Sequence, residues 1–88
     1  MSSEAAAVDR TIRALADPTR REILRALRAG PLTAGEIGSH FPLTAASVSH
    51  HLGVLEQANL LQRSKRGRWV FYEVTDSPVL DLLRSLAP

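Results

Sequence analysis

The sequence contains no cysteine, and this absence excludes disulfide bonds, thiolate zinc sites and cysteine nucleophiles. It also has no apolar run that approaches the roughly 20 residues of a membrane-spanning helix. The first segment, MSSEAAAVDR, lacks the basic flank and apolar stretch of a secretion signal. From these absences we expect a cytoplasmic protein with no membrane insertion.

Motifs for catalysis are missing as well. The sequence has no nucleophile–base motif, no phosphate-binding loop and no cluster of metal ligands. We therefore expect a protein that is not an enzyme and needs no cofactor. A metal site that joins His40 to His50 or His51 is an alternative, although it lacks a third ligand.

With 88 residues, the chain has the length of one small domain, which we expect to span residues 1–88. A domain of this size buries a smaller share of its surface than a larger one, so its core needs an additional support. The usual supports are disulfide bonds, a structural metal or oligomerisation. Since disulfide bonds are excluded, oligomerisation is favoured.

Apolar residues at helical spacing, together with capping residues, predict a series of helices before Asn59. Asp17 precedes Pro18 at the start of the second helix, and Thr33 with Glu36 forms a capping-box pattern at the third. Thr44 is the predicted cap of the fourth helix. Gly30-Pro31 and Asn59 are the predicted stops of the second and fourth helices. The third and fourth helices, joined by a tight break, are a candidate helix-turn-helix. The predicted helices cover about residues 4–16, 18–29, 33–41 and 45–58 of the sequence.

After Asn59, the spacing of the apolar residues changes from helical to alternating. We predict a two-stranded hairpin, with strands 60–65 and 68–74 around an Arg66-Gly67 turn. The last segment, 76–87, is predicted to form a fifth helix. This order of elements is that of a winged helix-turn-helix, a mainly α fold with a β-hairpin wing.

Two adjacent histidines, His50 and His51, lie in the fourth predicted helix. Adjacent helical residues point about 100° apart, so these two rings cannot bind one metal ion together. His51 falls at the margin of the apolar face, where we expect a partly buried, hydrogen-bonded ring. His50 falls on the outward face, which a recognition helix presents to the major groove.

Small and polar residues surround His50 on this outward face. They let the backbone approach bases closely, and hydroxyl groups can hydrogen-bond to base edges or phosphates. The free N–H groups at the start of the helix suit a phosphate. An ordinary solvent-facing helix start is the alternative for this segment taken alone. The DNA contacts expected here are Thr44, Ala45, Ala46, Ser47, Ser49 and His50.

Basic residues form two clusters in the sequence. In the hairpin, Arg66 or Arg68 is expected in the minor groove, and Arg63 and Lys65 at phosphates. This cluster suits a polyanion such as double-stranded DNA. The second cluster is interpreted as a solvated helix face and consists of Arg20, Arg21, Arg25 and Arg28.

Three segments resemble the ArsR/SmtB family of winged-helix repressors, namely LADPTRREILRALRAGPLTAGEI, ASVSHHLGVLEQANLL and GRWVFYEV. The resemblance covers roughly residues 12–75 in order and with the family's spacing. It implies a homodimer that blocks a promoter at an inverted repeat and releases it on a signal. Carried over by position, Ser47, Ser49 and His50 fall where the family contacts DNA.

The chain departs from the metal-sensing members of this family. Some members carry cysteines on the third helix, where this chain has LTAGEIG, and others carry Asp and His on the last helix, where SPVLDLLRSLA has no histidine. The resemblance is therefore to the metal-site-free, SdpR-like branch. An inducer, or a protein partner that relieves repression, is not identified by the sequence.

Apolar stripes on the first and last predicted helices favour a homodimer. One small core cannot easily bury both stripes, whereas antiparallel packing across a two-fold axis buries them together. The alternative is that both helices cover the core of their own protomer. The predicted interface residues are Val8, Ile12, Leu15, Val79, Leu82, Leu83 and Leu86.

The favoured function is sequence-specific transcriptional repression or autorepression by binding of double-stranded DNA. A protein-interaction module with the same fold is an alternative, because exposed Trp69 and Phe71 would form a contact surface. A repressor that senses an unidentified ligand or metal is a further alternative.

Overall fold

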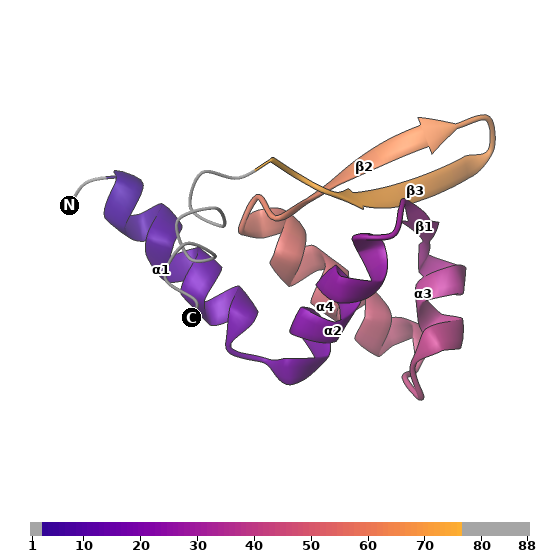
Figure 1. Ribbon diagram of the computed structural model, residues 1–88, viewed down its shortest axis with the longest axis horizontal. Coiled ribbons are helices and arrows are strands. Elements are labelled where there is room, and N and C mark those ends of the chain that lie inside the picture. The colour runs from indigo at the N-terminus through magenta and orange to yellow at the C-terminus, as the bar shows by residue number, and fades with distance from the viewer. Residues whose placement is uncertain (1–2, 77–88) are drawn as a thin grey trace.

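The computed structural model describes residues 3–76, which form four helices and one three-stranded antiparallel sheet (Figure 1). None of the described helices is long and apolar enough to cross a membrane. The elements are α1 (Ser3–Leu15), α2 (Pro18–Leu27), β1 (Leu32–Thr33), α3 (Ala34–His40), α4 (Ala45–Gln57), β2 (Leu61–Arg66) and β3 (Trp69–Val74).

Side-chain caps fix the start of three of these helices, as the sequence predicts. The Asp17 carboxylate accepts the backbone N–H of Arg20 at 3.0 Å, at the start of α2. Thr33 and Glu36 form the predicted reciprocal capping box on α3, with bonds of 3.1 and 3.0 Å. On α4, Thr44 Oγ1 accepts the N–H of Ser47 at 3.1 Å. Each cap satisfies an N–H group that the first turn of a helix leaves without a carbonyl partner.

Positive φ angles end two of the helices. Gly30, with φ of 152°, follows the last turn of α2, and Asn59, with φ of 59°, follows α4. Asparagine is one of the few residues besides glycine that adopts this left-handed conformation readily. After Asn59, the N–H of Leu60 returns to the carbonyl of Leu55 at 2.9 Å, and Leu60 is fully buried. The predicted stops of both helices are confirmed.

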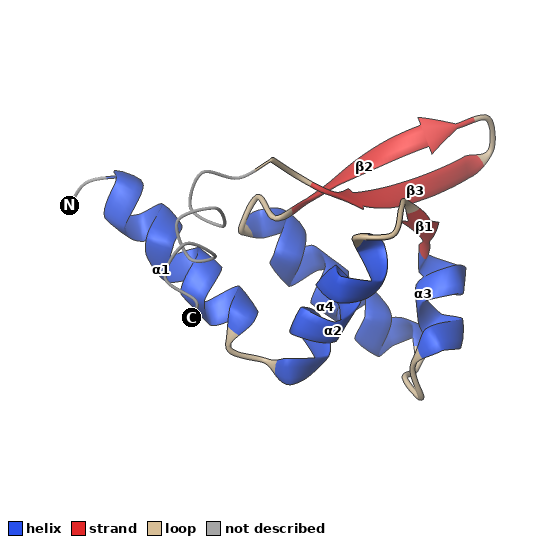
Figure 2. Ribbon diagram, in the orientation of Figure 1, coloured by secondary structure: helices blue, strands red, loops and turns tan. Residues whose placement is uncertain are grey.

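The sheet has the strand order β1-β3-β2, and Figure 2 shows it beside the helices. Arg66 pairs with Trp69, so the turn is Gly67-Arg68, and the predicted Arg66-Gly67 turn is wrong by one residue. Gly67 has φ of 62°, and glycine is favoured at the first central position of a type II′ hairpin turn.

The predicted two-stranded hairpin is present as β2 and β3, but the sheet also contains a third strand, β1, which was not predicted. Leu32 pairs with Tyr72 and Thr33 with Phe71, which ties the base of the wing to the start of α3. A strand of two residues is too short to show the alternating pattern on which strand prediction depends.

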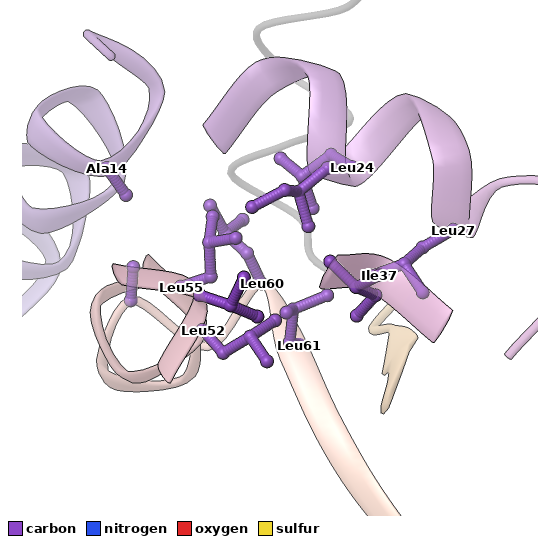
Figure 3. Close-up of a cluster of buried hydrophobic side chains, with 11 residues drawn as sticks. Ala14, Leu24, Leu27, Ile37, Leu52, Leu55, Leu60 and Leu61 are labelled. Atoms are coloured by element: carbon purple, nitrogen blue, oxygen red, sulfur yellow. The ribbon is translucent and has the colours of Figure 1, made fainter. Parts of the chain in front are cut away.

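The core lies where α2, α3, α4 and the base of the hairpin meet (Figure 3). The apolar residues whose helical spacing predicts the inward faces of α2 and α4 are all buried, namely Ile23, Leu24, Leu27, Val48, Leu52 and Leu55. Burial removes their apolar surface from water and is the main stabilising contribution to such a fold. The buried apolar residues are Ala14, Ile23, Leu24, Leu27, Ile37, Val48, Leu52, Leu55, Ala58, Leu60 and Leu61.

Helix α1 buries a different face from its apolar stripe. Thr11 and Ala14 are its buried side chains, with 2% and 0% of their surface exposed, whereas Ile12 is 51% exposed. Val8 and Leu15 are half-buried, and Leu15 packs against the core. The stripe is therefore largely left on the surface of the protomer. The predicted fifth helix, with Val79, Leu82, Leu83 and Leu86, lies outside the described residues.

Candidate nucleic-acid interface

Helices α3 and α4 form the predicted helix-turn-helix. The connection is short: α3 ends at His40, the N–H of Leu43 bonds to the carbonyl of Phe41 at 2.8 Å, and Thr44 caps α4. Val48, Leu52 and Leu55 anchor one side of α4 in the core. Most of the opposite side of its first two turns is exposed in the described part of the chain. Of the predicted contacts there, Ser47 is half-buried and the exposed ones are Thr44, Ala45, Ala46, Ser49 and His50.

The first turn of α4 begins in exposed residues. Thr44 accepts the N–H of Ser47 through its hydroxyl and that of Val48 through its carbonyl, at 3.1 and 3.0 Å. The N–H groups of Ala45 and Ala46 precede these and have no carbonyl partner within the helix. Their methyl side chains leave the approach open. The geometry therefore suits the predicted contact between the start of α4 and a phosphate.

The two histidines of α4 have the different surroundings that the sequence predicts. His50 is exposed, whereas His51 is half-buried and its Nδ1 lies 3.3 Å from Nη1 of Arg20. Their ring planes are inclined by 59°, with centroids 5.7 Å apart. Within residues 3–76, no group of three or more His, Cys, Asp or Glu residues is placed to hold a metal ion.

At the tip of the wing, arginine side chains stack on aromatic rings of β3. The Arg66 guanidinium lies 5.1 Å from the centroid of the Phe71 ring, and that of Arg68 lies 5.0 Å from the Trp69 ring. Both distances are within the range of a cation–π attraction, which restrains the long arginine side chains. Lys65 is exposed and pairs with Val70 on β3, so its side chain points to the opposite face of the hairpin from Arg66.

Arg63 has a protein partner that the sequence analysis did not identify. Its Nε lies 2.9 Å from Oε2 of Glu56, and the two side chains are 62% and 26% exposed. This ion pair joins β2 to the C-terminal part of α4 and holds the wing beside the recognition helix. Since the pair lies near the surface, its contribution to stability is small. Arg63 is thus engaged within the protein, and Lys65 is the less constrained cation of the strand.

The second basic cluster is only partly the solvated face that we predicted. Arg20 is half-buried, and its guanidinium donates to the carbonyls of Ala14 and Arg13 at 2.7 and 3.0 Å, besides contacting His51. Arg21 donates to the carbonyl of Leu15 at 2.7 Å. These bonds cap the C-terminal end of α1 from the next helix. No periodicity in the sequence signals such a contact, because it depends on how α1 and α2 fold back on each other.

Similarity to known proteins agrees with this arrangement. Residues 15–63 match a family described as a helix-turn-helix domain. The transcriptional repressor SdpR of Bacillus subtilis is 36% identical over 74 residues, which cover 84% of this chain and 82% of SdpR. The HTH-type transcriptional regulator CmtR of Mycobacterium tuberculosis is 41% identical over 80 residues, which cover 91% of this chain and 68% of CmtR.

A solved structure has the same fold over nearly the whole chain. It is an ArsR-like transcriptional regulator from Rhodococcus sp. RHA1, with a TM-score of 0.84 and 26% identity, and the match covers 97% of this chain and 80% of the other. Together with the helix-turn-helix and its wing, these likenesses establish both family and function. The chain belongs to the ArsR/SmtB family of winged-helix regulators, and it is a DNA-binding transcriptional repressor.

Proposed function

We propose that the protein acts as a homodimer that covers an inverted-repeat operator, with α4 of each protomer in a major groove. The observation that carries this proposal is the exposed first half of α4 beside an arginine-tipped hairpin. Binding to an operator requires both α4 and the hairpin, since contacts from the helix specify bases and contacts from the cationic side chains supply affinity.

On α4, the small residues and the His50 ring have different roles in recognition. Ala45, Ala46 and Ser49 are exposed and short, so they allow the helix axis to come close to the bases. A hydroxyl such as that of Ser49 can bond to base edges, and an alanine methyl can pack against the methyl group of thymine. His50 is the longest side chain of this face and projects farthest. We therefore assign it the main base-reading role.

On the wing, the arginines and the lysine have separate roles. Arg66 and Arg68 stand at the Gly67-Arg68 turn, where they reach a flanking minor groove, whose negative potential attracts arginine when the groove is narrow. Lys65 is exposed and contacts a phosphate. Arg63, paired to Glu56, contributes less to DNA affinity than its charge alone indicates.

The homodimer proposal is supported by α1. Ile12 is 51% exposed although it is a large apolar residue, and half-buried Val8 and Leu15 continue the same stripe. Contact with the same stripe of a second protomer, together with Val79, Leu82, Leu83 and Leu86, would remove this surface from water. A two-fold dimer places its recognition helices about 34 Å apart, one turn of DNA.

Selection of bound fragments from a random duplex library tests this proposal. We expect enriched fragments to carry two inverted half-sites whose centres are about 10 base pairs, or a multiple of this, apart. Enrichment of a single unpaired half-site would contradict the homodimer. A library that is bound without enrichment of any sequence would contradict base reading by α4.

A further inference from the structure

Helix α1 packs on the rest of its protomer through small side chains. Its buried residues are Thr11 and Ala14, and the Thr11 hydroxyl bonds back to the carbonyl of Ala7 at 3.0 Å. Large interlocking side chains fix the angle between two helices, because ridges on one fill grooves on the other. The fully buried face of α1 offers no such ridges, and the large side chain that packs against the core, half-buried Leu15, belongs to the last residue of the helix. A further contact is therefore needed to hold α1 at a defined angle to α4.

Arg20 supplies that contact. Its Nε donates to the carbonyl of Ala14 at 2.7 Å and its Nη2 to that of Arg13 at 3.0 Å, both in the last turn of α1. Its Nη1 lies 3.3 Å from Nδ1 of His51 on α4. The guanidinium is planar and its five N–H groups have fixed directions. One rigid group therefore joins the end of α1 to the middle of the recognition helix.

The chemistry of the pair sets what the contact requires of the histidine. Because arginine has only donors, Arg20 and His51 form a hydrogen bond when Nδ1 of the ring is the acceptor. The backbone of Arg20 is fixed as well, since its N–H donates to the Asp17 carboxylate at 3.0 Å. Half-buried Arg20 and half-buried His51 are thus shielded in part from competing water. A hydrogen bond to a charged group in such a place is stronger than an exposed one.

We propose that Arg20 is a positioning residue for operator recognition, which fixes the angle between α1 and α4 and so sets the distance between the two recognition helices. This inference rests on the homodimer proposed above, in which α1 belongs to the interface. Helix α4 has 13 residues and is therefore roughly 20 Å long. A 10° change in its tilt moves one end of the helix relative to the other by about 3.5 Å, close to the 3.4 Å rise of one base pair.

Arg20→Met tests the inference, because methionine keeps an apolar stem and removes all the donors. Arg21→Met is the matched control, since exposed Arg21 also caps α1, at Leu15, but within residues 3–76 it makes no hydrogen bond to α4. The measurement is the ratio of affinities for the selected operator and for the same operator with one base pair inserted between its half-sites. We expect Arg20→Met to lower this ratio by about tenfold, the size of a strong coupling between contacting residues. Arg21→Met should keep the wild-type ratio.

The histidine side of the contact gives a second, independent test. His51→Leu should lower the spacing ratio as Arg20→Met does, whereas His51→Asn, which retains an acceptor near Nδ1, should largely preserve it. The double variant Arg20→Met/His51→Leu should lose no more than either single variant, because both remove the same contact. If Arg20→Met fails to fold, His51→Leu and His51→Asn still decide the question.

The outcomes separate the two proposals. Wild-type protein that binds one half-site as tightly as two contradicts the homodimer. Wild-type protein that prefers one spacing, with Arg20→Met and His51→Leu retaining that preference, contradicts only the positioning role of Arg20. Affinity for a single half-site should change less than twofold in all these variants, since the base-reading face is intact, and a larger loss would show that Arg20 acts on the helix itself.

Discussion

At the scale of single residues, the two adjacent histidines of α4 lie on different sides of the helix. His50 is exposed beside Ala46 and Ser49, while His51 turns back toward Arg20. The 100° step between neighbours on a helix produces this division without any special local geometry. One ring is thus available to DNA, and the other connects the recognition helix to the rest of the protomer.

His50→Ala should lower the ratio of affinities for operator and random DNA by about tenfold, the lower part of the 1–3 kcal/mol that a good base contact supplies. The free energy of unfolding should change little, because the ring is exposed. Fluorescence titrations with both duplexes measure the ratio. Gln57→Ala, at the far end of α4, is the control. An equal loss on both duplexes would show that His50 does not read bases.

Asp17 gives the protein a pH-dependent part of its stability. The N–H of Arg20 donates to the Asp17 carboxylate and holds its pKa below the ordinary value of 3.8, with smaller contributions from the charges of Arg20 and His51 and partial opposition from burial. A lowered pKa in the folded state means that the ionised form stabilises the fold. This contribution is present above the unfolded pKa and is lost as the pH falls through the folded pKa.

Asp17→Asn isolates this effect, since asparagine is also a good N-cap and removes only the charge. At pH 7 the variant should unfold at lower denaturant concentration than the wild type. Below pH 3.8, the ordinary pKa of the group, the difference should shrink toward zero as the wild-type carboxylate becomes protonated. Urea unfolding at several pH values measures it. A difference that stays constant between pH 7 and pH 3 would be inconsistent with the proposed charge effect.

At the scale of elements, contacts restrain the wing both near its base and at its tip. Near the base, β1 pairs with β3, and the Arg63–Glu56 ion pair joins β2 to α4. At the tip, Arg66 and Arg68 are restrained by the rings of Phe71 and Trp69. Exposed Trp69 thus has a place in the wing as the support of Arg68.

Arg66→Ala and Arg68→Ala should each lower affinity for operator and random DNA alike. Each should also reduce the slope of log affinity against log salt by about 1, because fewer counterions are released. Titrations between low and moderate salt measure the slope. Arg28→Ala, an exposed arginine of the second cluster beyond the end of α2, should leave it unchanged. An unchanged slope in both wing variants would remove the wing from the binding surface.

Local chemistry explains which elements the sequence could predict. The caps at Asp17, Thr33 and Thr44 and the stop at Asn59 depend on neighbouring residues alone, and all were predicted correctly. Strand β1 was missed because its two residues are defined only by their pairing with β3.

Besides strand β1, the sequence could not show the contacts between segments that are distant along the chain. The Glu56–Arg63 ion pair and the bond of Arg20 to His51 join positions that carry no common motif. For the same reason, the stripe of α1 was recognised as apolar, but its exposure on the protomer became visible only in three dimensions. The predicted DNA-binding set lies on the surface, although Arg63 is paired within the protein.

At the scale of the whole molecule, the face of α1 that carries Ile12 leaves a large apolar side chain exposed on the protomer. Ile12→Asp should convert the proposed homodimer into a monomer, because a charged group cannot be buried in an apolar contact without a partner. The protomer should remain folded, since Ile12 is already 51% exposed in it.

Sedimentation velocity and circular dichroism measure these two expectations together. Arg10→Asp is the control and should stay dimeric, because Arg10 is exposed and lies on a different face of the same helix from Ile12. Operator affinity of Ile12→Asp should fall toward that for a single half-site, as the two recognition helices are no longer linked. A dimer that survives Ile12→Asp would place the interface elsewhere on the molecule.

The central claim is that the start of α4 and the wing form one surface that fits duplex DNA. Its most direct test is a titration of the ¹⁵N-labelled protein with the selected operator, followed by amide chemical shifts along the whole chain. We expect the largest shifts for residues 44–50 and 63–69, and small shifts at the exposed residues Arg21, Arg25 and Arg28. Larger shifts at Arg21, Arg25 and Arg28 than in α4 and the wing would contradict it.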